Sequence, residues 1–94
     1  SDEEIQILEK NATNGDKNSA FKLYQYHMFV SLDQDSEFKW LEIAAKNGHP
    51  IAQSNLADLF FTQGNKEKAI FWAKKAYRNG AKLPDELKIL ININ

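Results

Sequence analysis

Apolar residues recur along most of the chain with the period of an α-helix. Ala52, Leu56 and Phe60, for example, lie four positions apart and define one apolar face. The same spacing recurs within each repeat unit and predicts an all-α protein. Because the linkers are short, consecutive helices are expected to pack antiparallel. The six predicted helices span residues 2–13, 17–31, 35–47, 50–63, 66–79 and 84–91.

Glycine and proline mark the predicted helix ends. Gly15, Gly48 and Gly80 each follow a helical run and suit the left-handed conformation that closes a helix. Pro50 and Pro84 suit the first turn of the next helix, where an amide proton would have no partner. The side chains predicted to cap helix N-termini are Asp33 or Asp35, and Asn65.

The last six residues, Ile-Leu-Ile-Asn-Ile-Asn, end in an alternation of apolar and polar positions. Such an alternation suits either a β-strand or a frayed tail. We predict a short helix followed by a tail.

The chain repeats itself with a period of 32 to 33 residues. Residues 20–48 align with residues 52–80 without a gap, and residues 5–15 match residues 38–48. The identities of the longer alignment are Ala20/Ala52, Phe29/Phe61, Trp40/Trp72, Ala44/Ala76, Asn47/Asn79 and Gly48/Gly80. Two full repeats therefore follow an earlier half repeat.

The repeats predict a single domain over residues 1–94. Its parts are a half repeat (2–15), two repeats (16–48 and 49–80), and a C-terminal capping helix with its tail (81–94). Neither helix of a pair can bury its apolar face alone, so stacking of the pairs would complete the core. Small alanines one turn beyond each tryptophan would let the neighbouring helix approach.

The repeat pattern resembles the Sel-one-like repeats, a branch of the tetratricopeptide-like α-solenoids. The family's first helix has the motif A-x-x-x-L-G-x-x-Y and its second A-x-x-W-x-x-x-A-A-x-x-G. The matching residues are Ala52, Leu56, Ala57 and Phe60, then Ala69, Trp72, Ala76 and Gly80, and in the earlier repeat Trp40, Ala44, Ala45 and Gly48. The resemblance covers roughly residues 5–80, but the family's glycine-rich loop between the two helices is missing.

This resemblance implies an α-solenoid of antiparallel helix pairs that forms a right-handed superhelix. It also implies a non-catalytic scaffold or adaptor that binds a peptide or a partner protein, with no cofactor. Some bacterial members of the family are thought to neutralise a cognate toxin, so an immunity protein is an alternative. A second alternative is a structural piece of a longer repeat array.

In this architecture the first helix of each pair lines the concave surface. Residues 17–31 hold more apolar side chains than one buried face requires, and Phe61 matches Phe29 one repeat later. These side chains predict a groove for a peptide or a partner helix. Its predicted residues are Lys22, Tyr26, Phe29, Asp58 and Phe61. The alternative is that the aromatic rings pack inside a closed bundle.

The sequence offers little for catalysis or metal binding. There is no cysteine, no nucleophile elbow and no phosphate-binding loop. The acidic pairs lie in first turns of helices, where the helix dipole favours them. His27 is expected to pack with a polar tip, and His49, after a helix end, to be exposed. We therefore predict neither an enzyme nor a metal site.

Charge and hydropathy indicate which classes of partner the chain can bind. Twelve basic and thirteen acidic residues give a net charge of -1, which does not favour nucleic acid. Lysines concentrate in the last third, either as solvated helix faces or as a surface for an acidic partner protein. No apolar run is long enough for membrane insertion. Because the chain begins with Ser1, a leader could have been removed, and both cytoplasm and periplasm remain open.

Overall fold

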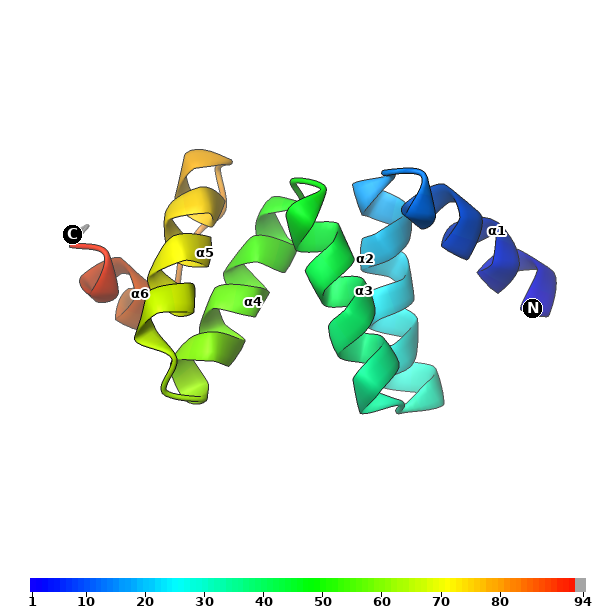
Figure 1. The fold of residues 1–94 in the computed structure, drawn as a ribbon, viewed down its shortest axis with the longest axis horizontal. Helices are drawn as coiled ribbons and strands as arrows, with labels where there is room; N and C mark the ends of the chain where they lie inside the picture. Colours follow the sequence, from blue (N-terminus) through cyan, green and yellow to red (C-terminus); the bar gives the residue numbers. More distant parts are fainter. Residues whose placement is uncertain (93–94) are drawn as a thin grey trace. The chain divides into compact units, whose positions relative to one another are not determined.

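The structure, a computed structural model, describes residues 1–92 and is all-α (Figure 1). No strand occurs among these residues. The six α-helices are α1 (Asp2–Thr13), α2 (Lys17–Tyr26), α3 (Gln34–Lys46), α4 (Pro50–Thr62), α5 (Lys66–Arg78) and α6 (Asp85–Leu90). A π-helical turn, η1 (His27–Ser31), continues α2. The all-α class and the six helices predicted from the sequence are confirmed.

Two details differ from the predicted helices. The segment predicted as one helix over residues 17–31 changes from α-helical to π-helical hydrogen bonding at His27. At the other end of the chain, α6 stops at Leu90, and Ile91 and Asn92 form a turn. The rest of the predicted tail, residues 93–94, lies outside the described residues.

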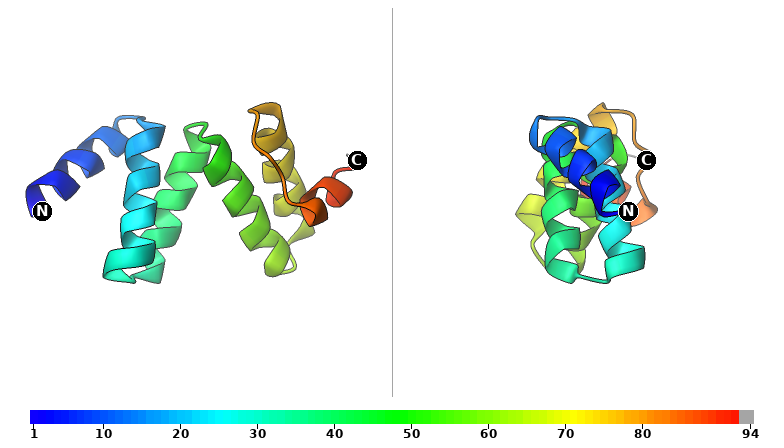
Figure 2. Two further views of the ribbon diagram at one scale, coloured as in Figure 1. Left: turned by 180° about the vertical axis from the view of Figure 1, so that it is seen from behind. Right: turned by 90° about the vertical axis from the view of Figure 1, so that its right-hand side faces the viewer.

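The chain forms two compact units that meet in sequence between His49 and Pro50. In the first unit, α2 packs against both α1 and α3. In the second, α5 packs against both α4 and α6. The pairs α2–α3 and α4–α5 each run antiparallel, as Figure 2 shows, which agrees with the short linkers.

The helices α1, α3 and α5 end in the same way. At the end of α3, Gly48 has φ +97°, and its N–H donates to the carbonyl of Ala45 at 3.1 Å. The N–H of His49 donates to the carbonyl of Ala44 at 3.0 Å, which completes a Schellman motif. The corresponding bonds close α1 at Gly15 and α5 at Gly80. The predicted glycine C-caps are confirmed.

The side-chain caps predicted for α3 and α5 are confirmed. The Asp33 carboxylate accepts hydrogen bonds from the backbone N–H groups of Asp35 and Ser36, so Asp33 and not Asp35 is the cap. Asn65 caps α5 and Asp16 caps α2. A hydrogen bond from the Ser36 hydroxyl is the main reason that the pKa of Asp33 is lowered. Pro50 begins α4, and Pro84 directly precedes α6.

The core of each unit is made of small and large side chains from facing helices. Trp40 and Trp72 are buried, and the alanines one turn later, Ala44 and Ala76, have no exposed surface. The other buried apolar side chains of the first unit are Ala12, Ala20, Leu23, Tyr24, Leu41 and Ala45. Those of the second are Ala52, Leu56, Ala57, Phe60, Ala69, Ala73, Leu83 and Leu87. Each tryptophan and the alanine one turn later are therefore both buried in the core, as the repeat predicts.

Leu32, directly after η1, has a backbone conformation that L-residues rarely adopt. Its φ is +57° and its ψ is +27°, and its side chain is exposed. In the second repeat the same place, 32 residues later, is Gly64 with φ +81°. A left-handed conformation costs a residue with a side chain about 1–2 kcal/mol, a cost that glycine avoids. The first repeat therefore stores strain where the second does not.

Leu32→Gly is expected to raise the free energy of unfolding by about 0.5–1 kcal/mol. The relief of backbone strain exceeds the extra entropy that glycine gives the unfolded chain. The exposed leucine side chain contributes little packing to offset this gain. Urea unfolding of the two proteins measures the difference. Gly64→Leu, the mirror change, should be destabilising, and equal stability of both variants and the parent would contradict this account.

Candidate functional site

The first unit exposes apolar side chains around η1. Phe29, Val30 and Leu32 are all largely exposed, with 71% of the Phe29 surface open to solvent. We refer to these three residues as the η1 patch. Of the predicted site residues, Phe29 belongs to this patch, Tyr26 is half-buried at the end of α2, and Lys22 is exposed one turn earlier.

The π-helical turn gives the η1 patch its position. The imidazole Nδ1 of His27 lies 2.7 Å from the Ser31 hydroxyl, and that hydroxyl accepts from the N–H of Asp33 at 3.3 Å. These contacts connect the turn to the start of α3. A π-helical turn contains one residue more than an α-helical turn, and such turns are common at functional sites. The helical spacing of the sequence gave no sign of it.

The second unit holds the other two predicted residues. Asp58 is exposed on α4, and Phe61 is half-buried near the end of the same helix. A shallow hollow, the α6 hollow, is lined by Phe61, Lys66, Glu86, Ile89 and Leu90. The sequence predicts a capping helix over residues 84–91, and its part in this surface appears only in the structure. The sequence signal that could have indicated this surface is the combination of apolar and charged residues within residues 84–91.

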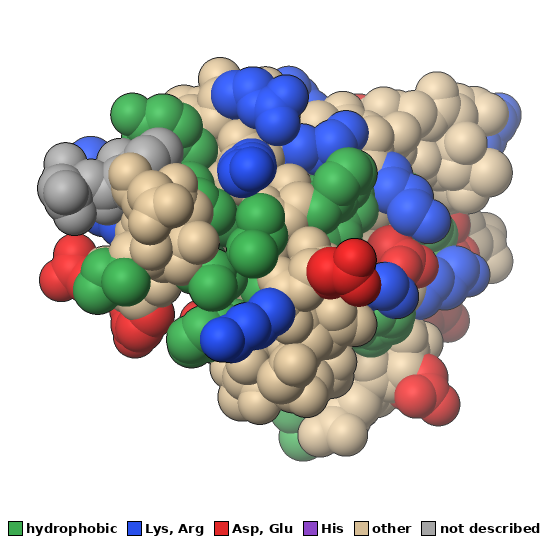
Figure 3. Space-filling model, turned by 60° about the vertical axis from the view of Figure 1, so that its left-hand side comes forward, with side chains coloured by type: hydrophobic (Ala, Val, Ile, Leu, Met, Phe, Trp, Pro, Cys, Tyr) green, Lys and Arg blue, Asp and Glu red, His purple; other side chains and the backbone are tan. Residues whose placement is uncertain are grey.

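A second hollow lies in the first unit. The α1 hollow is lined by Glu4, Ile7 and Leu8 of α1 and by Lys22 of α2. Like the α6 hollow, it combines apolar side chains with one acid and one lysine. On the face drawn in Figure 3, hydrophobic side chains are exposed among lysine, arginine and acidic side chains. Both hollows are therefore suited to protein contacts rather than to a buried small molecule.

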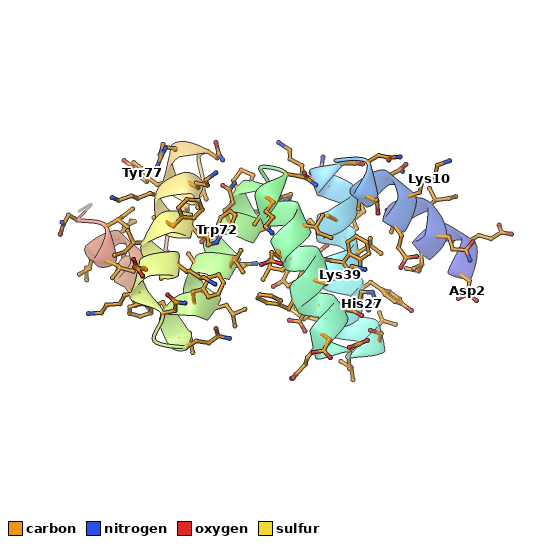
Figure 4. All side chains as sticks on the ribbon, in the orientation of Figure 1. Asp2, Lys10, His27, Lys39, Trp72 and Tyr77 are labelled. Carbon is orange, nitrogen blue, oxygen red and sulfur yellow. The ribbon has the colours of Figure 1, made fainter. Side chains whose placement is uncertain are left out.

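The two histidines have different surroundings. His49, predicted to be exposed, is half-buried, so that prediction was wrong. Its ring stacks on the Phe21 ring of α2 with a centroid distance of 4.1 Å, and this contact takes one face of the imidazole out of solvent. His27, labelled in Figure 4, is half-buried as expected, and its Nε2 is buried with no hydrogen-bond partner among the described residues.

The environment of His49 makes the stability of the fold depend on pH. Burial lowers the pKa of His49 from its ordinary value of 6.5, and the positive charge of Lys17 lowers it further. The folded state therefore binds a proton less readily than the unfolded state. The stability that depends on neutral His49 is present above pH 6.5 and is lost as the pH falls towards the lowered pKa.

His49→Phe is expected to flatten the dependence of stability on pH below about 6.5. Phenylalanine keeps the ring stack on Phe21 but carries no titrating group. Urea unfolding at several pH values measures the slopes for the two proteins. The lowered pKa values of Asp16 and Asp33 act in a more acidic range, below 3.8, and remain in both. Parallel stability curves between neutral pH and pH 5 would contradict this assignment.

Within residues 1–92, no group of three or more His, Asp or Glu side chains is arranged to hold a metal ion. No helix in this part of the chain is both long enough and apolar enough to cross a membrane. The described residues therefore form a small all-α protein built of helix pairs, with apolar side chains exposed on several helices.

Comparison with known proteins adds one relative. The chain is 32% identical over 87 residues to YibG of Escherichia coli (strain K12), which is described as an uncharacterized protein. The match covers 85% of this chain and 57% of YibG, so the chain spans little more than half the length of that relative. No family model matches the chain, and no solved structure matches it significantly.

Proposed function

We propose that this chain is a non-catalytic protein-binding module of the helical-repeat type. Its pairs α2–α3 and α4–α5 have buried tryptophans and alanines at equivalent positions, and the second helices α3 and α5 end in the same Schellman motif. These regularities support an α-solenoid related to the Sel-one-like and tetratricopeptide-like repeats. Proteins of this architecture bind other proteins along their helical surface.

The observation that carries the proposal is the exposure of the η1 patch. Large contiguous apolar patches are uncommon on proteins that act alone, and exposed aromatic side chains often anchor a partner. Phe29 is the aromatic anchor of this patch, and Tyr26 and Lys22 precede it on α2. Phe61 and Asp58 would have the corresponding role on α4. The bound species is a peptide or a helix of another protein.

The test is capture of a partner from the source organism with the purified chain, followed by affinity measurement with the identified protein. Phe29→Ser is expected to weaken that affinity at least tenfold, which corresponds to about 1.4 kcal/mol. Phe61→Ser is expected to weaken it as well. Phe71→Ser is the matched control, because Phe71 is an exposed phenylalanine on the second helix α5.

All variants must first show the helical circular dichroism of the parent. Undiminished binding by both Phe29→Ser and Phe61→Ser would contradict the proposed surface. A loss of binding for Phe71→Ser alone would move the binding surface from the first helices to α5.

A further inference from the structure

A third hollow lies in the first unit, apart from the η1 patch and from the two hollows described above. The helices α1 and α3 both pack against α2 and make few contacts with each other, so a space of about 450 Å³ stays open between them. Ala12 and Thr13 form its α1 side, and we refer to it as the Lys39 hollow. Its α3 side is lined by Lys39, Trp40, Ile43, Lys46 and the cap residue Asn47.

The Lys39 hollow carries positive charge only. Lys39, labelled in Figure 4, and Lys46 are both exposed, and none of the described residues that line the hollow is acidic. The α1 and α6 hollows, by contrast, each contain one acid and one lysine. Residues 1–49 contain nine acidic and five basic residues, a net charge of −4 with neutral histidine. The hollow is therefore a local reversal of the charge of its own unit.

Both lysines can bind a further anion. The Nζ of Lys46 lies 3.9 Å from the Oε1 of Glu42, and the two side chains are 64% and 38% exposed. An exposed ion pair of this kind contributes little to stability, so another carboxylate can take the place of Glu42. The Nζ of Lys39 lies 4.7 Å from the ring centroid of Trp40. This cation–π contact uses no hydrogen-bond acceptor, so the ammonium group can still donate.

Asn47 adds a neutral donor to the two lysines. It takes the position that Asn79 has in the second repeat, where the Nδ2 of Asn79 donates to the Oε1 of Gln53 at 2.9 Å. The residue of the first repeat that corresponds to Gln53 is Phe21, whose ring offers no such acceptor. The exposed Asn47 amide is therefore not held as that of Asn79 is, and it lines the hollow.

The charged residues surround an apolar floor. Ala12 and Trp40 are buried, and Ile43 is half-buried. Lys39, Ile43 and Asn47 follow one another at intervals of four residues, so they lie on one face of the end of α3. Such a surface fits a segment in which acidic side chains flank an apolar one.

We propose that the Lys39 hollow binds an acidic segment of another protein, with an apolar side chain against Ile43 and carboxylates at Lys39 and Lys46. The open shape suits a peptide segment, since a small molecule needs a pocket that encloses most of it. Nucleic acid is disfavoured, because the net charge of −4 on the first unit repels a phosphate backbone. The hollow shares no residue with the η1 patch or with α4, so this binding goes beyond the proposed function.

The test is a titration of the ¹⁵N-labelled 94-residue chain followed by two-dimensional NMR. The probe is a capped synthetic peptide, Glu-Asp-Leu-Asp-Glu, and the matched control peptide, Gln-Asn-Leu-Asn-Gln, has the same shape without charge. The acidic peptide is expected to shift the amide signals of Lys39, Ile43 and Asn47, with half-saturation at about 1 mM or below. Added salt should weaken this binding, and the neutral peptide should bind at least about fivefold more weakly.

A double variant tests the lysines themselves. Lys39→Gln/Lys46→Gln is expected to weaken binding of the acidic peptide by about fivefold or more, because two charge contacts are lost. Lys74→Gln/Lys82→Gln is the matched control, because it removes two exposed lysines from the second unit and so has the same net charge. Unchanged amide signals away from the substituted residues show that each variant is folded.

Three results would overturn the proposal. One is the absence of saturable shifts at the hollow at acidic-peptide concentrations up to about 10 mM. Another is equal binding of the acidic and neutral peptides, or equal binding by the parent chain and Lys39→Gln/Lys46→Gln. The third is tighter binding of single-stranded oligothymidylate than of the acidic peptide at these residues, which would assign the hollow to nucleic acid.

Discussion

Trp72→Ala is expected to lower the free energy of unfolding by about 3–5 kcal/mol. The indole is 9% exposed and lies on α5, the helix that packs against both α4 and α6. Its removal takes a large apolar surface out of the core and leaves a cavity that the neighbouring helices cannot close without moving. This makes it the largest single effect expected in the second unit.

Urea or thermal unfolding followed by circular dichroism measures this loss. Phe71→Ala provides the control, because the adjacent ring meets the indole edge-on at 5.1 Å but is itself exposed. The control should cost about 1 kcal/mol or less. A similar loss for both variants would mean that Trp72 is not the packing centre of this unit.

Ala76→Leu is expected to lower the free energy of unfolding by about 1–3 kcal/mol, although it adds apolar atoms. Ala76 has no exposed surface, and its carbonyl accepts the N–H of Ala81 in the Schellman motif that ends α5. A larger side chain has no space there unless a neighbouring helix moves away. The effect is opposite in sign to that expected from hydrophobicity alone.

Lys74→Leu is the matched control, because it adds a leucine to an exposed position of the same helix. The control should change stability by no more than about 0.5 kcal/mol. If Ala76→Leu proved as stable as the parent, the requirement for a small residue after each tryptophan would be refuted.

The positions of the helices and their caps could be predicted from the sequence because they depend on neighbouring residues. Asp33 binds backbone groups two and three residues later, and Gly48 closes a motif within six residues. The period of the apolar residues predicted which side chains are buried, as Trp40, Ala44 and Phe60 illustrate. The repeat itself also followed from the sequence, since each pair needs the same residues at the same spacing.

The sequence does not show whether the apolar side chains beyond the core positions are buried or exposed. Whether Phe29 is exposed depends on the π-helical turn and on what packs around it, and neither has a local signature. The exposure of Phe29 at 71% and the half-buried state of Phe61 appear only in the folded chain. Their part in binding stays a prediction.

The existence of the six helices, the glycine ends of α1, α3 and α5, and the small residues of the core follow from the sequence, because they depend on hydrogen bonds and spacing within a few residues. Tertiary structure alone decided the stacking of His49 on Phe21, which lie far apart in sequence. It also decided the hollow that joins Phe61 to Ile89. Such contacts depend on how whole helices pack, and the exposure of a side chain is fixed only when every helix beside it is in place.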